Sequence, residues 1–342
     1  MVDPDGSYER KIQLTGGTTY TVSLPKPWAN AQGIEVGDRF RLHPRGDRIL
    51  VAPSDAGSSG DAVTVSAAQY NPEQIGQIVV AAYVAGATTV RIEGRPDRAV
   101  SKAVREAAAG LVGVEVATES DSEIVVRTML DVADLSPTQT LAQLESVALS
   151  IHEAAVDAAL SADGEAGRQI AARDDSVDRL FGLVAREFQR SLVDVTGDRA
   201  GDGLTTFDQY TVARQLERIG DHAEKIAQVA ERIESEPPAE LTVELTELAA
   251  DARAAVRRAL SETMNGRNPE ALSDVLTEGA AVVEETSALD RTLYDRELAD
   301  GYALATVLDS ITRTAEYGRN IAEAGLRASL RNADAEPVTA NS

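Results

Sequence analysis

The feature that most constrains this fold is the long helix-forming run between Ser136 and about Leu330. Its apolar residues recur at the three- and four-residue spacing of amphipathic helices. Breaks rich in glycine, proline and aspartate predict six helices, with approximate spans of 137–161, 165–194, 203–235, 239–264, 269–299 and 302–331. Short breaks imply antiparallel neighbours, so we expect three-helix bundles.

This helical run contains an internal repeat. Residues 216–228 (LERIGDHAEKIAQ) align with residues 311–323 (ITRTAEYGRNIAE) at an offset of 95, so that Asp221 corresponds to Glu316. A repeat of this length predicts two copies of one structural unit. We therefore expect tandem three-helix bundles over residues 133–236 and 239–331.

The N-terminal part has a different pattern. Short strands and glycine turns over residues 8–53 predict a small β domain. After a polar linker, residues 61–130 alternate strands with helices, which predicts a small α/β domain of βαβ type whose role the residues leave open. Asn71 is the expected cap of its first helix, with Pro72 at the first position. The predicted fold class is therefore multidomain α+β.

Composition limits the chemistry available to the chain. It has 342 residues, no cysteine and a net charge of −23, so any metal must bind oxygen or histidine ligands. No apolar run is long enough for a membrane span and no signal-peptide pattern is present, which predicts a cytoplasmic protein without membrane insertion. The acid excess combined with only four lysines is typical of salt-adapted proteins.

Charge is distributed unevenly along the chain. Residues 8–53 carry seven basic and four acidic side chains, a local net charge of +3. A small basic module in a very acidic chain points to a polyanionic partner, because phosphate neutralisation dominates nucleic-acid affinity.

Acidic side chains also follow one strip of the helix predicted over 203–235. Glu217, Asp221 and Glu224 lie beside a seam of small and apolar residues that would let a neighbouring helix approach closely. Asp174 and Asp178 occupy the matching edge of the preceding helix, so carboxylates from two helices can face each other and hold a hard cation. A solvated acidic face is the alternative, because 56 acids in this chain give about nine such pairs by chance.

Three stretches, YTVARQLERIGDHAEKIA, DDSVDRL and ITRTAEYGRNIAE, resemble the paired signature helices of the PhoU family. The resemblance covers roughly residues 133–331 and is to an archaeal, haloarchaeal-like type. It implies a regulator of phosphate transport with two tandem three-helix bundles and a carboxylate-bound cluster of iron, manganese, magnesium or zinc.

The resemblance also implies which carboxylates bind the metal. In the first bundle these are Asp174, Asp178, Glu217, Asp221 and Glu224. Asp175 is an alternative to Asp174, if the family pattern is aligned one residue further along the chain. The second bundle departs from the family pattern, because Thr286 stands where an acid is expected. The candidates there are Glu285, Asp290 and Glu316.

The segment TYTVSLPKPWANAQGIEVGDRFRL, followed by GDRILVAP, is similar to the AbrB-like (SpoVT/AbrB) swapped-hairpin family. The resemblance implies an intertwined homodimer whose basic strands and loops contact DNA, although some relatives of this fold bind a partner protein instead. The candidate DNA contacts are Arg10, Lys11, Lys26, Arg39 and Arg41. Trp28 is expected in the hydrophobic core rather than as a platform for base stacking.

These features predict a DNA-binding transcriptional regulator of phosphate uptake whose bundles sense metabolic state through metal-bound phosphate or a partner. The alternative is a PhoU-type adaptor that negatively regulates the phosphate ABC transporter or its signalling partner without reading DNA. We recognise no catalytic triad or nucleophile elbow in the sequence, so we do not expect an enzyme. His222 is expected on a helix surface.

Overall fold

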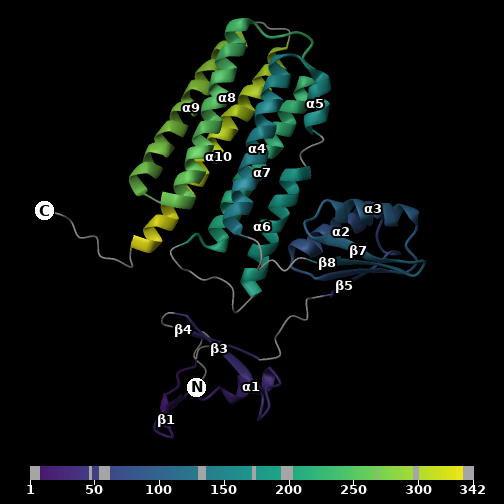
Figure 1. Cartoon of the computed structure of the whole chain (residues 1–342), viewed down its shortest axis with the longest axis vertical. Coiled ribbons are helices and arrows are strands. Elements are labelled where there is room, and N and C mark those ends of the chain that lie inside the picture. The colour runs from purple at the N-terminus through teal and green to yellow at the C-terminus, as the bar shows by residue number, and fades with distance from the viewer. Residues whose placement is uncertain are drawn as a thin grey trace, which may run out of the picture. The chain divides into compact units, whose positions relative to one another are not determined.

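The structure is a computed structural model that describes residues 8–45, 48–53, 62–129, 136–171, 175–193, 203–266, 268–295 and 300–333. It divides into two compact units, Met1–Ser59 and Gly60–Ser342 (Figure 1). Within the described residues, no helix combines the length and the apolar character needed to cross a lipid bilayer.

The first unit is built from short hairpins, as the sequence predicts. Its elements are β1 (Gln13–Thr15), β2 (Thr19–Thr21), α1 (Lys26–Ala31), β3 (Phe40–Arg45) and β4 (Arg48–Pro53). β1 pairs with β2, and β3 pairs with β4, both antiparallel. Gly16 and Gly17 turn the chain between β1 and β2 with φ values of 65° and 76°, a region that side chains disfavour.

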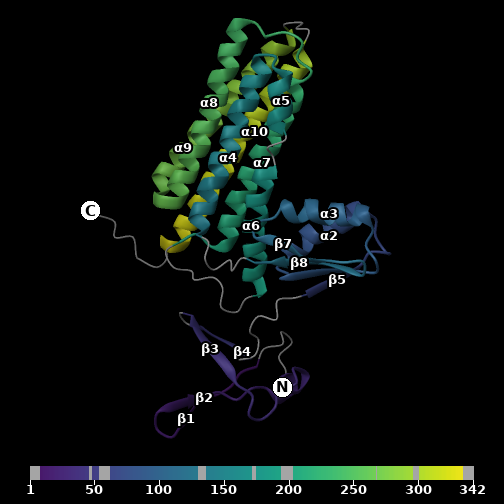
Figure 2. The ribbon, with the colours of Figure 1, turned by 45° about the vertical axis from the view of Figure 1, so that its right-hand side comes forward.

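The second unit begins with an α/β segment. Its elements are β5 (Ala62–Ser66), α2 (Pro72–Val84), β6 (Thr89–Glu93), α3 (Arg98–Ala109), β7 (Val114–Glu119) and β8 (Glu123–Thr128). The sheet order is β5-β6-β8-β7, in which only β5 and β6 are parallel. Helices α2 and α3 lie on one face of this sheet (Figures 1 and 2). Asn71 caps α2 and Pro72 begins it, as predicted.

The remainder of the second unit is helical. Its elements are α4 (Pro137–Leu160), α5 (Gly164–Ala171), α6 (Asp175–Val193), α7 (Thr206–Ala230), α8 (Ala239–Ser261), the π-helical turn η2 (Glu262–Gly266), α9 (Pro269–Asp295) and α10 (Gly301–Ala333). Helices α4 to α7 pack together as one bundle, and α8 to α10 as another. The single helix predicted over 165–194 is described as two, α5 and α6. The multidomain α+β class is confirmed.

The two bundles meet along α7 and α10, the helices that carry the sequence repeat. His222 of α7 lies 3.1 Å through Nδ1 from Ser310 Oγ and 3.2 Å through Nε2 from the hydroxyl of Tyr317. His222 and Tyr317 are equivalent in the repeat, so equivalent positions meet across the bundle interface, as they do in a two-fold contact. His222 is therefore half-buried at this interface, and its expected place on a helix surface is wrong.

Helices α6 and α7 approach each other closely at Gly220. The predicted seam of α7 is buried, and a Cβ atom on Gly220 would lie 2.9 Å from Cγ1 of Val177, which is itself fully buried. Val177 is β-branched and has little rotamer freedom in a helix, so it cannot move aside cheaply. The absence of a side chain at Gly220 sets the spacing of these two helices.

This contact predicts that Gly220→Ala changes the stability of the protein in opposite directions, depending on whether Val177 is present. Gly220→Ala should destabilise the protein by about 1 kcal/mol, because overpacking costs ~1–3 kcal/mol and outweighs a gain in helix propensity of ~1 kcal/mol. In a Val177→Ala background, where the clash is absent, the same substitution should be stabilising. Urea unfolding of the four proteins measures both effects, and equal effects in the two backgrounds would contradict the contact.

Candidate functional site

Three carboxylates from α6 and α7 converge beside this close contact. Asp178, Glu217 and Asp221 each offer an oxygen, and these oxygens lie within 4.8 Å of one another. Glu217 and Asp221 share a strip of α7 because they are four residues apart, and Asp178 follows Val177 on α6. Glu217 is 8% exposed, whereas Asp178 and Asp221 are exposed to solvent. The group is therefore buried at Glu217 and open to solvent at Asp178 and Asp221.

The electrostatics of the group are unfavourable without a cation. Burial, followed by the charge of Asp221, raises the pKa of Glu217 to about 7. Burial and the charges of Asp221 and Asp175 also raise the pKa of Asp178. Arg214 offsets part of this repulsion, since its Nη1 donates to Glu217 Oε1 at 2.7 Å. Like charges held together in this way favour either protonation or a bound cation.

The donor set fits a hard cation. Glu217 Oε2 is buried and has no hydrogen-bond partner among the described residues, so one member of the group has a buried acceptor without a donor. All three donors are carboxylate oxygens, which suit manganese, magnesium or iron, and the chain has no cysteine for a softer site. Asp178, Glu217 and Asp221 would hold such an ion.

The other predicted ligands of the first bundle are placed differently. Asp174 lies outside the described residues. Glu224 is half-buried and accepts a hydrogen bond from Gln228 Nε2 at 2.9 Å, and it is not part of the group of three. Asp175, the alternative to Asp174, is exposed in the first turn of α6.

The predicted ligands of the second bundle do not form a matching group among the described side chains. Glu285 and Asp290 are exposed, and Glu316 accepts a hydrogen bond from Arg313 Nη1 at 2.8 Å.

The repeat gives a reason for this difference between the bundles. At the offset of 95, Thr312 replaces Glu217 and Arg319 replaces Glu224. The second bundle therefore has an arginine where the first has an acid.

The predicted DNA contacts lie in the first unit. Arg10, Lys11, Lys26, Arg39 and Arg41 are all exposed. None of them forms an ion pair with another described residue, so their charges are available to an external partner. Arg10 instead donates to the backbone oxygen of Glu9 and lies over the ring of Tyr8.

The same unit buries none of its described side chains. Trp28 is 41% exposed and Leu42 is 64% exposed, so the predicted core position of Trp28 is not found within a single chain. Isolated hairpins of this size are marginally stable in water unless an apolar face is covered. The apolar side chains of one copy therefore lack the burial that a stable domain requires.

One residue that the sequence did not indicate joins the α/β segment to the first bundle. Arg186 of α6 is 1% exposed, and its Nη1 donates to the carbonyl oxygens of Tyr83 and Ala87, the latter at 2.9 Å. Its guanidinium also lies 4.7 Å from the ring centroid of Tyr83. Arg186 lies off the apolar seam of α6 and its partners are about 100 residues away in the chain, so local periodicity carried no signal for this contact.

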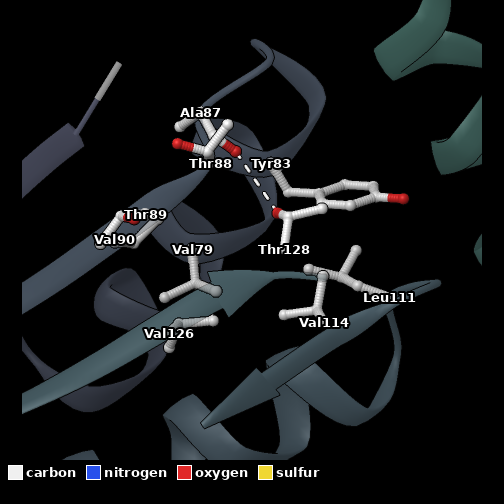
Figure 3. Close-up of a pocket in the computed structure, with 10 residues that line it drawn as sticks. All are labelled: Val79, Tyr83, Ala87, Thr88, Thr89, Val90, Leu111, Val114, Val126 and Thr128. Carbon is white, nitrogen blue, oxygen red and sulfur yellow. Dashed lines mark hydrogen bonds between the residues drawn. The ribbon is translucent and has the colours of Figure 1, made fainter. Parts of the chain in front are cut away.

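The interior of the α/β segment leaves little space. Figure 3 shows a cavity beside Tyr83 and Ala87, where the Thr128 hydroxyl donates to the Ala87 carbonyl oxygen. Its volume is about 10 Å³, which is room for one water molecule at most. This cavity is therefore too small for any ligand larger than water.

Comparison with known proteins identifies two regions of the chain. The family model described as PhoU domain matches residues 141–230. A second model, described as antidote-toxin recognition MazE, bacterial antitoxin, matches residues 13–58. These matches fall on the first bundle and on the basic module.

Individual proteins are also similar to part of this chain. A protein of Xylella fastidiosa named phosphate-specific transport system accessory protein PhoU homolog is 25% identical over 187 residues, which are 53% of this chain and 77% of that protein. The crystal structure of PhoU from Pseudomonas aeruginosa is 21% identical, with a TM-score of 0.50 over 57% of this chain and 96% of that one. PhoU from Streptococcus pneumoniae is 18% identical, with a TM-score of 0.49 over 56% and 92% of the two chains. The Pseudomonas structure shows the shared helical fold.

The geometry predicts which carboxylates control cation binding. Asp178→Asn combined with Asp221→Asn should weaken manganese binding about tenfold or more, because two of the three negative charges that attract the cation are lost. Equilibrium dialysis followed by elemental analysis measures this change. Asp290→Asn removes an exposed carboxylate of the second bundle and should leave manganese binding unchanged. An equal loss in both proteins would contradict the assignment.

Proposed function

Because this chain carries a PhoU domain and a MazE/AbrB-like domain, we propose that it is a DNA-binding regulator of phosphate uptake. The observation that carries this proposal is the pairing of an exposed basic module with helical bundles that contain one three-carboxylate group. The module would bind promoter DNA in the cytoplasm, and the bundles would respond to the phosphate status of the cell. The role is regulatory and non-catalytic.

The proposal includes a homodimer built through the first unit. In one chain, β1–β2 and β3–β4 form separate two-stranded sheets, and apolar side chains such as Leu14, Leu42 and Ile49 are exposed. A second copy that intertwines with the first would pair the edges of these sheets and bury these side chains. The dimer would thus have neither the unpaired strand edges nor the exposed apolar side chains of one chain. The dimer would also bring two basic surfaces to one DNA site.

The charge distribution supports DNA as the partner of this module. Residues 8–53 carry a net charge of +3 within a chain of net charge −23, so the rest of the chain repels DNA. Binding would therefore be confined to the module, where Arg39 and Arg41 lie just before and within β3. Their contacts to phosphates would make affinity strongly dependent on salt.

The bundles supply the sensing part of the proposal. A hard cation held by Asp178, Glu217 and Asp221 would present positive charge to anion oxygens at the open side of the group. The buried and unpartnered oxygen of Glu217 supports this use of the group rather than a solvated acidic face.

A second candidate function is an adaptor of the phosphate transport system. The relative from Xylella fastidiosa bears the name of a transport accessory protein, which favours this reading for the helical region. In that case the first unit would serve for dimerisation or for binding a partner protein. An adaptor would show no preference for promoter sequence, so DNA binding separates the two functions.

The proposed dimer predicts how the fluorescence of the single tryptophan depends on the oligomeric state. Trp28 should show the blue-shifted fluorescence of a buried indole when the chain is dimeric, and a red shift when the dimer dissociates. Leu42→Asp should produce the red-shifted monomer, because a charge would enter the apolar contact. Val243→Asp introduces the same charge at an exposed apolar residue of α8 and serves as the control. Light scattering gives the mass, and a red-shifted dimer would contradict the model.

DNA binding predicts a specific effect of salt. Each phosphate contact contributes about 0.9 to the slope of log affinity against log salt. Arg39→Ala and Arg41→Ala should each lower affinity for a phosphate-transport promoter and reduce this slope by about 0.9. Lys102→Ala removes an exposed base of α3 and should leave both unchanged. Titrations across salt concentrations measure the slope.

Genome-wide occupancy in native cells tests the regulator directly. Peaks at phosphate-transport promoters that change between phosphate-replete and phosphate-starved cultures are the expected result. The absence of discrete peaks in both cultures would overturn the regulator and support the adaptor.

A further inference from the structure

A large pocket lies where the α/β segment packs against the first bundle. A pocket of about 520 Å³ has one wall from α2 and α3 and another from α6 and α7. This volume falls within the ~300–1,000 Å³ of typical small-molecule sites. Arg186 holds the two walls together through its bonds to Tyr83 and Ala87, so the pocket is part of one fixed arrangement.

One face of α6 runs along the whole pocket. Asp175, Asp178, Gly182, Ala185 and Gln189 line it at successive spacings of three, four, three and four residues. This stretch of helix is ~20 Å long at 1.5 Å per residue. Gly182 and Ala185 have no bulky side chain, so the pocket is elongated and suits an extended molecule rather than a compact one.

The middle of the pocket is apolar. The wall from the α/β segment presents Val80, Val84 and Leu111. The wall from the bundle presents the rings of Phe181 and Tyr210, whose centroids are 5.8 Å apart. Hydroxyl-rich ligands such as sugars would lose hydrogen bonds to water against these side chains, so the body of the ligand has to be largely hydrocarbon.

The charged groups of the pocket are predominantly acidic. Asp175 and Asp178 come from α6 and Glu106 comes from α3, so both walls carry carboxylates. Asp175 and Asp178 form no ion pair or hydrogen bond with other described residues. Arg214 is the basic lining residue, and it is already bonded to Glu217 and lies over Phe181. The pocket therefore favours cations.

We propose that this pocket binds an aliphatic polyamine, with its methylene chain against the apolar walls and its ammonium groups at the carboxylates of α6 and α3. A chain of this type is extended, hydrocarbon in its body and positively charged at intervals. It thus satisfies the length, the apolar middle and the acidic groups together.

The site would connect the α/β segment to the cation group. Asp178 belongs to both, so a polyamine and a metal ion would compete for the same carboxylate. By linkage, each would lower the affinity of the other by the same factor. The inference goes beyond the proposed function and does not depend on DNA binding.

Calorimetry with spermidine and the full chain tests the proposal. Saturable binding of one spermidine per chain is expected at moderate salt. Glu106 is exposed and pairs with Lys102 Nζ at 3.5 Å. Glu106→Gln should therefore weaken spermidine binding about two- to fivefold, through the loss of one exposed carboxylate. Butylamine, which has one charge, should bind at least about tenfold more weakly. Val80→Trp should also reduce binding, since it fills the pocket at a residue that is partly exposed.

The matched control is Glu115→Gln on β7, which changes the net charge equally but lies outside the pocket. Non-specific attraction of polyamines to an acidic protein would weaken equally in Glu106→Gln and Glu115→Gln. That result, or the absence of saturable binding, would overturn the proposal.

Glu106 belongs to neither the cation group nor the basic module. A chain that binds manganese and promoter DNA normally but not spermidine would therefore fail this inference alone.

Discussion

The close approach of α6 and α7 at Gly220 is the contact on which the candidate site depends. Without a side chain at Gly220, Val177 packs directly against the backbone of α7. This spacing brings Asp178 within reach of Glu217 and Asp221, and it leaves one oxygen of Glu217 buried without a donor. Helix packing thus accounts for the charge repulsion that favours a bound cation, because three acids are held together by apolar contacts elsewhere on the same helices.

The two bundles share the sequence repeat and its helix packing, but they differ in the acidic side chains of the candidate cation site. Equivalent helices α7 and α10 pack against each other, and the equivalent residues His222 and Tyr317 meet at their interface. The positions beside this interface are free to differ. Where the first bundle has Glu217 and Glu224, the second has Thr312 and Arg319. The second bundle therefore retains its core without assembling three carboxylates among its described residues.

The basic excess of the chain is confined to residues 8–53 of the first unit. This segment carries a net charge of +3 and buries none of its described side chains, whereas the second unit is acidic and has two apolar cores. Under the proposed function, this division confines DNA to the module and cations to the bundles. Under the proposed polyamine site, the α/β segment would take part in ligand binding through the surface that it presents to α6 and α7.

The sequence alone determined the fold class, the helix caps, the repeat and the α7 strip that carries Glu217 and Asp221, because these follow from local periodicity and from side-chain chemistry. It also pointed to Asp178, although a solvated acidic face remained open. Only the tertiary structure decided that Glu217 is buried, that Glu224 stands apart and that His222 lies between bundles, since these depend on which helices become neighbours. The bond from Arg186 to Tyr83 and the pocket beside it were beyond sequence reasoning for the same reason: they join surfaces about 100 residues apart in the chain, which no local pattern records.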